Sequence, residues 1–195
     1  VHRVVDDDVI EFILLGQLAL GGLETLEHLG LVLKKYEQMG ISIERGEREC
    51  TAWRERPLRP TDIQTLPFPG FPTDMQAQSM CLLAMAEGSC IITENVFESR
   101  FMFASELQRM GANIVIEGHH AIVHGVPAFS GTQVKSPDLR GGAALVMAGL
   151  VADGLTTVSA IHHIDRGYEG FVEKLCSLGA HAQRVSVPDA TDLLD

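Results

Sequence analysis

The sequence lacks the features that mark a membrane protein or a nucleic-acid-binding protein. No apolar run approaches the roughly 18 residues of a membrane-spanning helix. Basic residues are few, since 15 Lys and Arg stand against 26 Asp and Glu, which gives a formal net charge of -11. Such a surface repels nucleic acid and anionic lipid, so we expect neither as a partner. A site for an anionic substrate must therefore be locally basic within an acidic protein.

Cysteine is also scarce. The four cysteines are Cys50, Cys81, Cys90 and Cys176, and no two of them have the C-x-x-C spacing of metal ligands. Because disulfide frameworks belong to oxidising compartments, we expect reduced, structural cysteines in a cytoplasmic protein. Residues 1–5 contain neither an initiator Met nor a signal-peptide pattern, so we expect the chain to begin inside a longer reading frame.

Motifs for a metal or a cofactor are missing as well. The histidine pairs His119–His120 and His162–His163 are adjacent in sequence, and adjacent residues do not share a face of a helix or strand. Gly141–Gly142 is not part of a G-x-x-x-x-G-K-[ST] phosphate loop. We therefore predict no metal and no cofactor.

What is present is a repeat. Gly22, Gly88 and Gly154 lie 66 residues apart, and each separates an apolar, helix-like run from a strand-like run. The helix-like runs are 13–20, 80–86 and 143–150. A glycine just past a helix end adopts positive φ without steric strain. Because a helix that is apolar all round must be covered on most faces, we predict three buried helices.

A second series of glycines has nearly the same period. Gly40, Gly111 and Gly179 each follow an amphipathic, helix-like segment and precede a strand-like one, at spacings of 71 and 68 residues. Repeated signals at a fixed period indicate a repeat architecture. We predict one α/β domain over residues 1–195, with a pseudo-threefold repeat of βαβαββ-like units and buried helices. The three units span about 1–66, 67–134 and 135–195.

Helix starts and loops complete this prediction. Residues 73–76 read as a capping box, and Ser136 precedes Pro137 as an N-cap precedes a proline at the first helical position. The proline-rich segment 57–72 reads as a loop between units, because proline is excluded from helix interiors and inner strands.

Four segments resemble the enolpyruvyl transferase family, and within it the UDP-N-acetylglucosamine 1-carboxyvinyltransferases. They are 68–78 (FPGFPTDMQAQ), 92–101 (ITENVFESRF), 138–143 (DLRGGA) and 163–169 (HIDRGYE). The resemblance covers nearly the whole chain and implies the C-terminal domain of such an enzyme. In that family each of two domains is an inside-out barrel, a threefold repeat with buried helices, which agrees with the repeat described above.

The resemblance also implies a reaction. The family transfers the enolpyruvyl group of phosphoenolpyruvate to the 3-hydroxyl of UDP-N-acetylglucosamine, an early step of peptidoglycan synthesis that serves cell wall biogenesis, cell shape and division. Its N-terminal domain carries a reactive Cys on a mobile loop and a Lys, which have no counterpart here. Around residues 9–12 the chain also departs from the family pattern. We expect the N-terminal domain as a partner in cis and expect the chain to be inactive without it.

Five residues match the family's site residues. The resemblance implies that Asp74 contacts the sugar hydroxyl and accepts its proton, which such a weak nucleophile requires. It implies that Arg100, Arg140 and Arg166 hold the anionic groups of phosphoenolpyruvate, for which the planar guanidinium is suited. It also implies that the backbone of Val96 meets the UDP-sugar.

The residues by themselves leave other interpretations open. An aspartate in the first turn of a helix, such as Asp74, interacts favourably with the helix dipole without any catalytic role. Each arginine alone reads as a surface ion pair, and for Arg140 the partner would be Asp138 or a neighbouring carboxylate. Val96 reads as a buried residue at a strand end, and Phe97 as a residue of either the sugar site or the core.

Two other functions remain open at this point. The chain could be a non-catalytic UDP-sugar-binding domain or pseudoenzyme, which the altered start and the missing N-terminal domain favour. It could also belong to the sister 3-phosphoshikimate 1-carboxyvinyltransferases, which share the fold but usually lack the PTDMQAQ run at residues 72–78.

Overall fold

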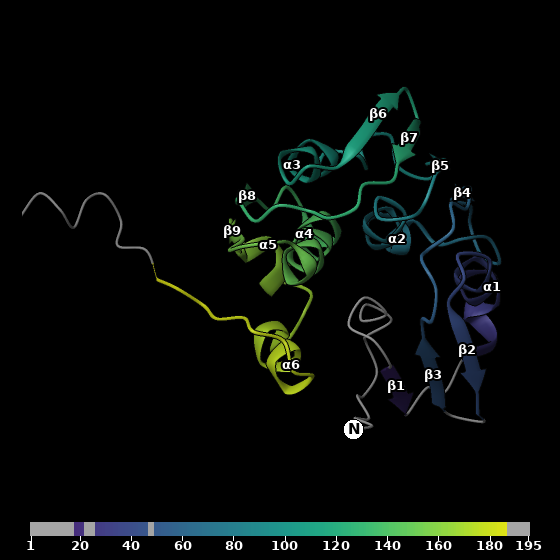
Figure 1. Cartoon of the computed structure of the whole chain (residues 1–195), viewed down its shortest axis with the longest axis horizontal. Helices are drawn as coiled ribbons and strands as arrows, with labels where there is room; N and C mark the ends of the chain where they lie inside the picture. The colour runs from purple at the N-terminus through teal and green to yellow at the C-terminus, as the bar shows by residue number, and fades with distance from the viewer. Residues whose placement is uncertain (1–17, 22–25, 47–48, 187–195) are drawn as a thin grey trace, which may run out of the picture.

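The computed structural model describes residues 18–21, 26–46 and 49–186 (Figure 1). Its elements in chain order are β1 (Leu18–Gly21), the 3-10 helix η2 (Leu26–Leu29), α1 (Gly30–Gln38), β2 (Ser42–Arg45), β3 (Glu49–Trp53), β4 (Ile63–Gln64), the 3-10 helix η3 (Thr73–Met75), α2 (Gln76–Leu83), β5 (Ser89–Thr93), α3 (Ala104–Arg109), β6 (Asn113–Glu117), β7 (His120–His124), β8 (Gln133–Lys135), α4 (Leu139–Val151), β9 (Thr157–Ser159), α5 (His162–Asp165) and α6 (Phe171–Ser177). The predicted α/β class is confirmed.

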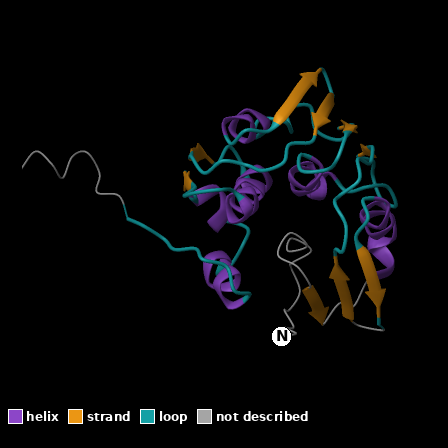
Figure 2. Ribbon diagram, in the orientation of Figure 1, coloured by secondary structure: helices purple, strands orange, loops and turns teal. Residues whose placement is uncertain are grey.

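The described strands form three small sheets (Figure 2). The first has the order β1-β3-β2 and is antiparallel. The second has the order β4-β5-β7-β6, in which β4 pairs parallel with β5 and the other pairs are antiparallel. The third is the parallel pair β8-β9. The order β1-β3-β2 therefore repeats in the second sheet as β5-β7-β6.

Helices α2 and α4 lie side by side between these sheets (Figure 1). Every residue of α2 is buried, and so is most of α4. The two helices are in direct contact, since the Cys81 thiol of α2 donates to the Ala144 carbonyl oxygen of α4 over 3.3 Å. On another side of α4, a Cβ on Gly142 would lie 2.1 Å from the Ser136 hydroxyl oxygen, so only glycine fits there. The prediction of buried helices over 80–86 and 143–150 is confirmed, although α2 ends at Leu83.

The prediction of a helix over 13–20 is wrong at its end, because Leu18–Gly21 is strand β1. Residues 13–17 and Gly22 lie outside the described residues. The physical reason is long-range pairing, since β1 runs antiparallel to β3 from Leu18↔Ala52 to Gly21↔Glu49. A short apolar run is compatible with either helix or strand, and its partner decides.

The second glycine series caps helices as predicted. Gly40, Gly111 and Gly179 follow α1, α3 and α6 and have φ of 91°, 97° and 100°. Strands β2 and β6 follow the first two glycines as predicted, and each pairs with the next strand of a hairpin. The strand predicted after Gly179 is wrong, because residues 180–186 form neither helix nor strand.

Two predicted caps and one predicted loop need correction. The Thr73 hydroxyl donates to Glu94 rather than to its own helix, so residues 73–76 form no capping box. The N-cap of α4 is Asp138, whose carboxylate accepts from the backbone of Arg140 and Gly141. Within the proline-rich loop, Ile63–Gln64 forms β4 because it finds an edge beside β5.

The core contains large buried side chains from all parts of the described chain, among them Tyr36, Phe71, Phe103 and Phe129. A smaller cluster of Ala143, Ile164, Phe171 and Leu175 packs α6 and the α5 segment against α4. No helix among the described residues is long and apolar enough to cross a membrane.

Three of the cysteines are buried, as expected for structural residues. Burial raises the pKa of the Cys81 thiol to about 12 and that of the Cys90 thiol to about 11. Cys50 is buried too, whereas Cys176 is exposed and donates to the Ala182 carbonyl. The prediction of a structural role in packing is therefore wrong for Cys176.

Candidate functional site

Three charged side chains from separate segments meet at the N-terminal ends of α2 and α4. Asp74 lies in η3, Arg100 in the turn after β5, and Arg140 in the first turn of α4. The Nη2 of Arg100 lies 2.6 Å from Oδ1 of Asp74, and the Nη2 of Arg140 lies 3.0 Å from its Oδ2. Each carboxylate oxygen thus accepts a hydrogen bond from one guanidinium, which brings Asp74, Arg100 and Arg140 together.

Arg140 is fixed by a second partner. Its Nη1 donates to the Tyr168 hydroxyl over 2.9 Å, and its guanidinium lies 5.5 Å from the centroid of the Tyr168 ring. Its backbone N–H donates to the Asp138 carboxylate at the helix cap. Burial alone would lower the pKa of Arg140, but the bonds to Asp74 and Tyr168 outweigh burial and raise the pKa. Arg140 therefore remains protonated.

Asp74 is held as a carboxylate. Partial burial alone would raise its pKa, but the hydrogen bonds and charges of Arg140 and Arg100 outweigh burial and lower the pKa below the usual aspartate value. The side chain is nonetheless 54% exposed, so a molecule from solvent can reach it. An exposed, doubly paired carboxylate can accept a hydrogen bond from a ligand hydroxyl.

Arg100 has an unused donor. Its guanidinium lies 4.9 Å from the centroid of the Phe97 ring, and its side chain is only 17% exposed. Its Nε is buried without a hydrogen-bond partner among the described residues. A buried polar group of this kind requires a partner, and an oxyanion of a ligand would supply one.

Arg166 and Val96 are placed differently. Arg166 follows α5, is exposed, and makes no ion pair with Asp74 in the described part of the chain; it stands two residues before Tyr168. Val96 is 40% exposed in the turn after β5, and Phe97 is exposed as well, so the interpretations of both as core residues are wrong. The Val96 N–H donates to Glu94 over 2.8 Å.

Glu94 organises the loop beside this site, and the sequence did not single it out. Its carboxylate is buried, with 3% of the residue exposed, and accepts from the hydroxyls of Thr65 and Thr73. It also accepts from the backbone N–H groups of Val96 and Phe97. One signal was available: an acidic residue directly after an apolar strand is unusual at a buried position.

Tyr168 was missed for a different reason. It stands in the segment 163–169 that carries the resemblance, but in that segment the resemblance implies a binding role for Arg166 alone. The Arg140–Tyr168 contact forms only because α4 packs against α5 and the segment that follows it, and the sequence does not reveal this packing.

No group of three or more His, Cys, Asp or Glu residues among those described is arranged to hold a metal ion. The rings of His119 and His120 have centroids 4.0 Å apart, and those of His162 and His163 have centroids 4.1 Å apart. Both pairs are neighbours along the chain that lie ring against ring rather than around a shared ion.

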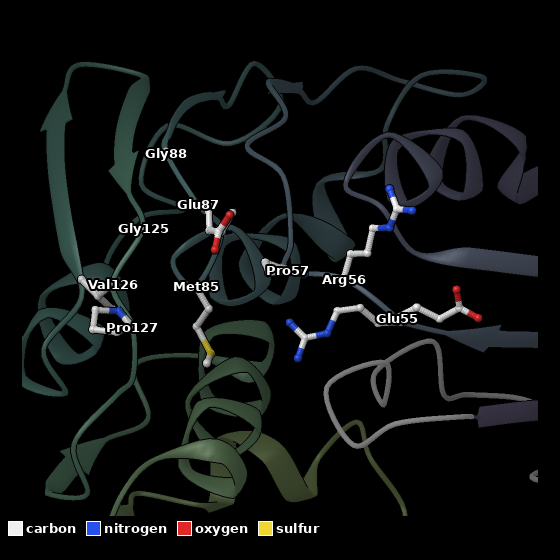
Figure 3. Close-up of a pocket in the computed structure, with 11 residues that line it drawn as sticks. Glu55, Arg56, Pro57, Met85, Glu87, Gly88, Gly125, Val126 and Pro127 are labelled. Carbon is white, nitrogen blue, oxygen red and sulfur yellow. The ribbon is translucent and has the colours of Figure 1, made fainter.

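A cavity of about 670 Å³ lies at the opposite end of α2 (Figure 3). Its walls come from the segments that follow β3, α2 and β7, and include Arg56, Met85, Glu87 and Val126. Asp74 precedes the first residue of α2 and Glu87 follows its last turn, so this cavity is separate from the charged site.

The chain is similar in sequence to proteins of one known family. The family model for EPSP synthase (3-phosphoshikimate 1-carboxyvinyltransferase) matches residues 19–175. UDP-N-acetylglucosamine 1-carboxyvinyltransferase 2 of Carboxydothermus hydrogenoformans is 49% identical over 95% of this chain and 46% of its own length. UDP-N-acetylglucosamine 1-carboxyvinyltransferase 1 of Symbiobacterium thermophilum is 47% identical over 94% of this chain and 43% of its own length.

A solved structure is similar as well. The enolpyruvyl transferase NikO from Streptomyces tendae matches with a TM-score of 0.82 at 33% identity, over 89% of this chain and 41% of its own. The chain thus spans less than half the length of each of these three relatives.

Proposed function

Because this chain belongs to the EPSP synthase family of enolpyruvyl transferases, we propose that it is the substrate-binding half of an enzyme that transfers enolpyruvyl from phosphoenolpyruvate to the 3-hydroxyl of UDP-N-acetylglucosamine. The single observation that carries the proposal is the pairing of Asp74 with Arg100 and Arg140. The names of the similar proteins support the choice of sugar. In this proposal the protein acts in the cytoplasm, in peptidoglycan precursor synthesis, and so serves cell wall biogenesis, cell shape and division.

Asp74 is the proposed base. A carboxylate whose pKa is lowered by two guanidinium groups is a weak base, which suits the resting state. Phosphoenolpyruvate brings a carboxylate and a phosphate that compete for Arg100 and Arg140. As the substrate takes these cations from Asp74, the carboxylate becomes more basic at the moment when the sugar hydroxyl must lose its proton.

The arginines and Val96 are the proposed binding groups. The unused Nε of Arg100 and the forked guanidinium of Arg140 would hold the anionic groups of phosphoenolpyruvate. Arg166 is exposed and free to reach a bound substrate from the segment after α5. Since the N–H of Val96 is occupied by Glu94, we assign the sugar contact to the Val96 carbonyl oxygen.

We further propose that the domain is built of three repeats, over about 1–66, 67–134 and 135–195. The shared strand order of β1-β3-β2 and β5-β7-β6 supports this division. The parallel pairs β4-β5 and β8-β9, each joined through a buried helix, recur at the two boundaries between units and support it as well. The positive φ of the glycines after α1, α3 and α6 supports it again.

The proposed partner is the family's N-terminal half in cis, since the relatives named above are more than twice as long as the aligned region. The two halves would close over the substrates. Closure of this kind excludes water and completes a site whose groups come from both sides.

The test mixes this chain with the N-terminal half of a similar UDP-N-acetylglucosamine 1-carboxyvinyltransferase, adds phosphoenolpyruvate and UDP-N-acetylglucosamine, and measures phosphate release. The expected result is release that depends on both halves and is lost in the Asp74→Asn variant. Binding of the sugar nucleotide without any release would overturn the proposal in favour of a non-catalytic domain. Release with 3-phosphoshikimate in place of the sugar nucleotide would overturn it in favour of the sister reaction.

A further inference from the structure

We propose that Glu94 is a positioning residue that fixes Asp74 and Arg100 relative to each other. This inference rests on the function proposed above. Glu94 touches neither of them. It is joined to each through one intermediate residue, Thr73 on one side and Phe97 on the other.

The Glu94 carboxylate accepts four hydrogen bonds. Its Oε1 accepts from the Thr65 hydroxyl at 2.8 Å, the Val96 N–H at 2.8 Å and the Phe97 N–H at 3.1 Å. Its Oε2 accepts from the Thr73 hydroxyl at 2.9 Å. Three of these bonds fall on Oε1 and one on Oε2, and bonds to a charged acceptor are stronger than neutral ones. These bonds hold the carboxylate in one orientation.

Its position is anchored in the second sheet. Thr65 follows β4, is fully buried, and donates its backbone N–H to the Thr93 carbonyl over 2.9 Å. The Thr65 hydroxyl accepts from the Asn95 N–H over 3.0 Å. The backbone N–H of Glu94 donates to the His119 carbonyl over 2.8 Å. Glu94 directly follows β5 and is thus connected to the end of β4 through Thr65 and to the start of β7 through His119.

Two arms lead from this anchor to the charged pair. Through Thr73, the residue directly before Asp74, Glu94 holds the first turn of η3. Through the Phe97 N–H it holds the ring that lies beneath the Arg100 guanidinium, at 4.9 Å. The 2.6 Å bond between Arg100 and Asp74 completes a closed ring of contacts that begins and ends at Glu94. Each arm therefore fixes one member of the pair relative to the other.

This ring of contacts matters because small displacements of reacting groups lower the rate of a catalysed reaction. A shift of about 1 Å in a reacting group can lower the rate about 100-fold. Loss of one arm should leave Glu94 buried and the sheet intact, while Asp74 moves relative to Arg100. A purely structural residue would instead change the stability without changing the environment of Asp74.

The experiment compares three threonine variants of the full chain. Thr73→Val removes one arm at nearly constant volume, and Thr73→Ser restores the hydroxyl. Thr93→Val is the matched control, because it removes a threonine hydroxyl on β5 that bonds His120 instead of Glu94. The readout is the titration of the Asp74 carboxyl by carbon-13 NMR, followed by kcat and KM for UDP-N-acetylglucosamine with the N-terminal half added.

In Thr73→Val we expect the pKa of Asp74 to rise towards the ordinary value and kcat to fall about tenfold or more with KM for the sugar nearly unchanged. Thr73→Ser should restore both, and Thr93→Val should change neither. An Asp74 titration in Thr73→Val identical to wild type would overturn the inference. Because the titration needs no turnover, a shifted Asp74 without any phosphate release would support the positioning role and count against the proposed function alone.

Discussion

Arg140 and Asp74 stand 66 residues apart in the sequence, and the Nη2 of Arg140 lies 3.0 Å from the Oδ2 of Asp74. This separation equals the spacing of Gly88 and Gly154, which follow α2 and α4. The two residues thus occupy matching places at the starts of two buried helices that lie side by side. Because both helices begin at the same end of the domain, the charged residues at their starts meet there.

The Asp74 ion pairs predict a specific dependence of stability on pH. Because the pKa of folded Asp74 is lowered, the pairs stabilise the fold above the ordinary aspartate pKa of about 3.9, and this stabilisation is lost as the pH falls through the lowered pKa. For a half-exposed pair we expect about 1 kcal/mol or less. Thermal melts between pH 2 and 7 of wild type and Asp74→Asn should converge at the acid end; parallel curves would contradict the pairing.

Replacing Arg100 by lysine should weaken anion binding although the charge is kept. Lysine cannot provide the forked donors of the guanidinium, and it cannot lie flat on the Phe97 ring. We expect the affinity for phosphoenolpyruvate, measured by calorimetry with the N-terminal half present, to fall about tenfold.

Arg109→Lys is the control, since Arg109 forms an exposed pair with Glu106 on α3. An equal loss of affinity in both variants would show that net charge, rather than the geometry at Arg100, controls binding.

The close approach at the start of α4 predicts opposite effects for two glycine substitutions. In Gly142→Ala the new Cβ would lie 2.1 Å from the Ser136 Oγ, so we expect a loss of about 1–3 kcal/mol in the free energy of unfolding. In Gly30→Ala, at the start of α1, the Cβ meets nothing within 4 Å, and we expect a gain of about 0.5–1 kcal/mol. Urea denaturation measures both; a harmless Gly142→Ala would disprove the tight packing.

Thiol chemistry should separate Cys176 from the other cysteines. Burial raises the pKa of Cys50, Cys81 and Cys90, and the thiolate is the reactive form. Iodoacetamide at neutral pH should therefore label one site per folded chain, and Cys176→Ser should abolish that labelling. Rapid labelling of Cys81 by iodoacetamide, detected by mass spectrometry, would mean that the α2–α4 contact opens readily.

The sequence predicts local features well and long-range partners poorly. The buried helices over 80–86 and 143–150 follow from apolar composition, and the turns at Gly40, Gly111 and Gly179 follow from the helix that each ends. These signals are local. Strand β1 was predicted as helix because its pairing with β3, far along the chain, decides its conformation.

The same distinction holds in the candidate site. Asp74, Arg100 and Arg140 were predicted from the motifs that contain them, and they meet. Glu94 and Tyr168 were not, because their roles arise from partners on other elements, Thr73 in one case and Arg140 in the other. The role of a residue that acts through a distant partner cannot be predicted from the few residues around it in the sequence.

The titration of Asp74 with and without phosphoenolpyruvate tests the central claim most directly. By carbon-13 NMR, the chain with the N-terminal half added should show an Asp74 pKa below the ordinary aspartate value. The pKa should then rise when phosphoenolpyruvate binds, because its anionic groups draw Arg100 and Arg140 away from the carboxylate. An ordinary pKa in the free protein, or a pKa that saturating phosphoenolpyruvate leaves unchanged, would contradict the account.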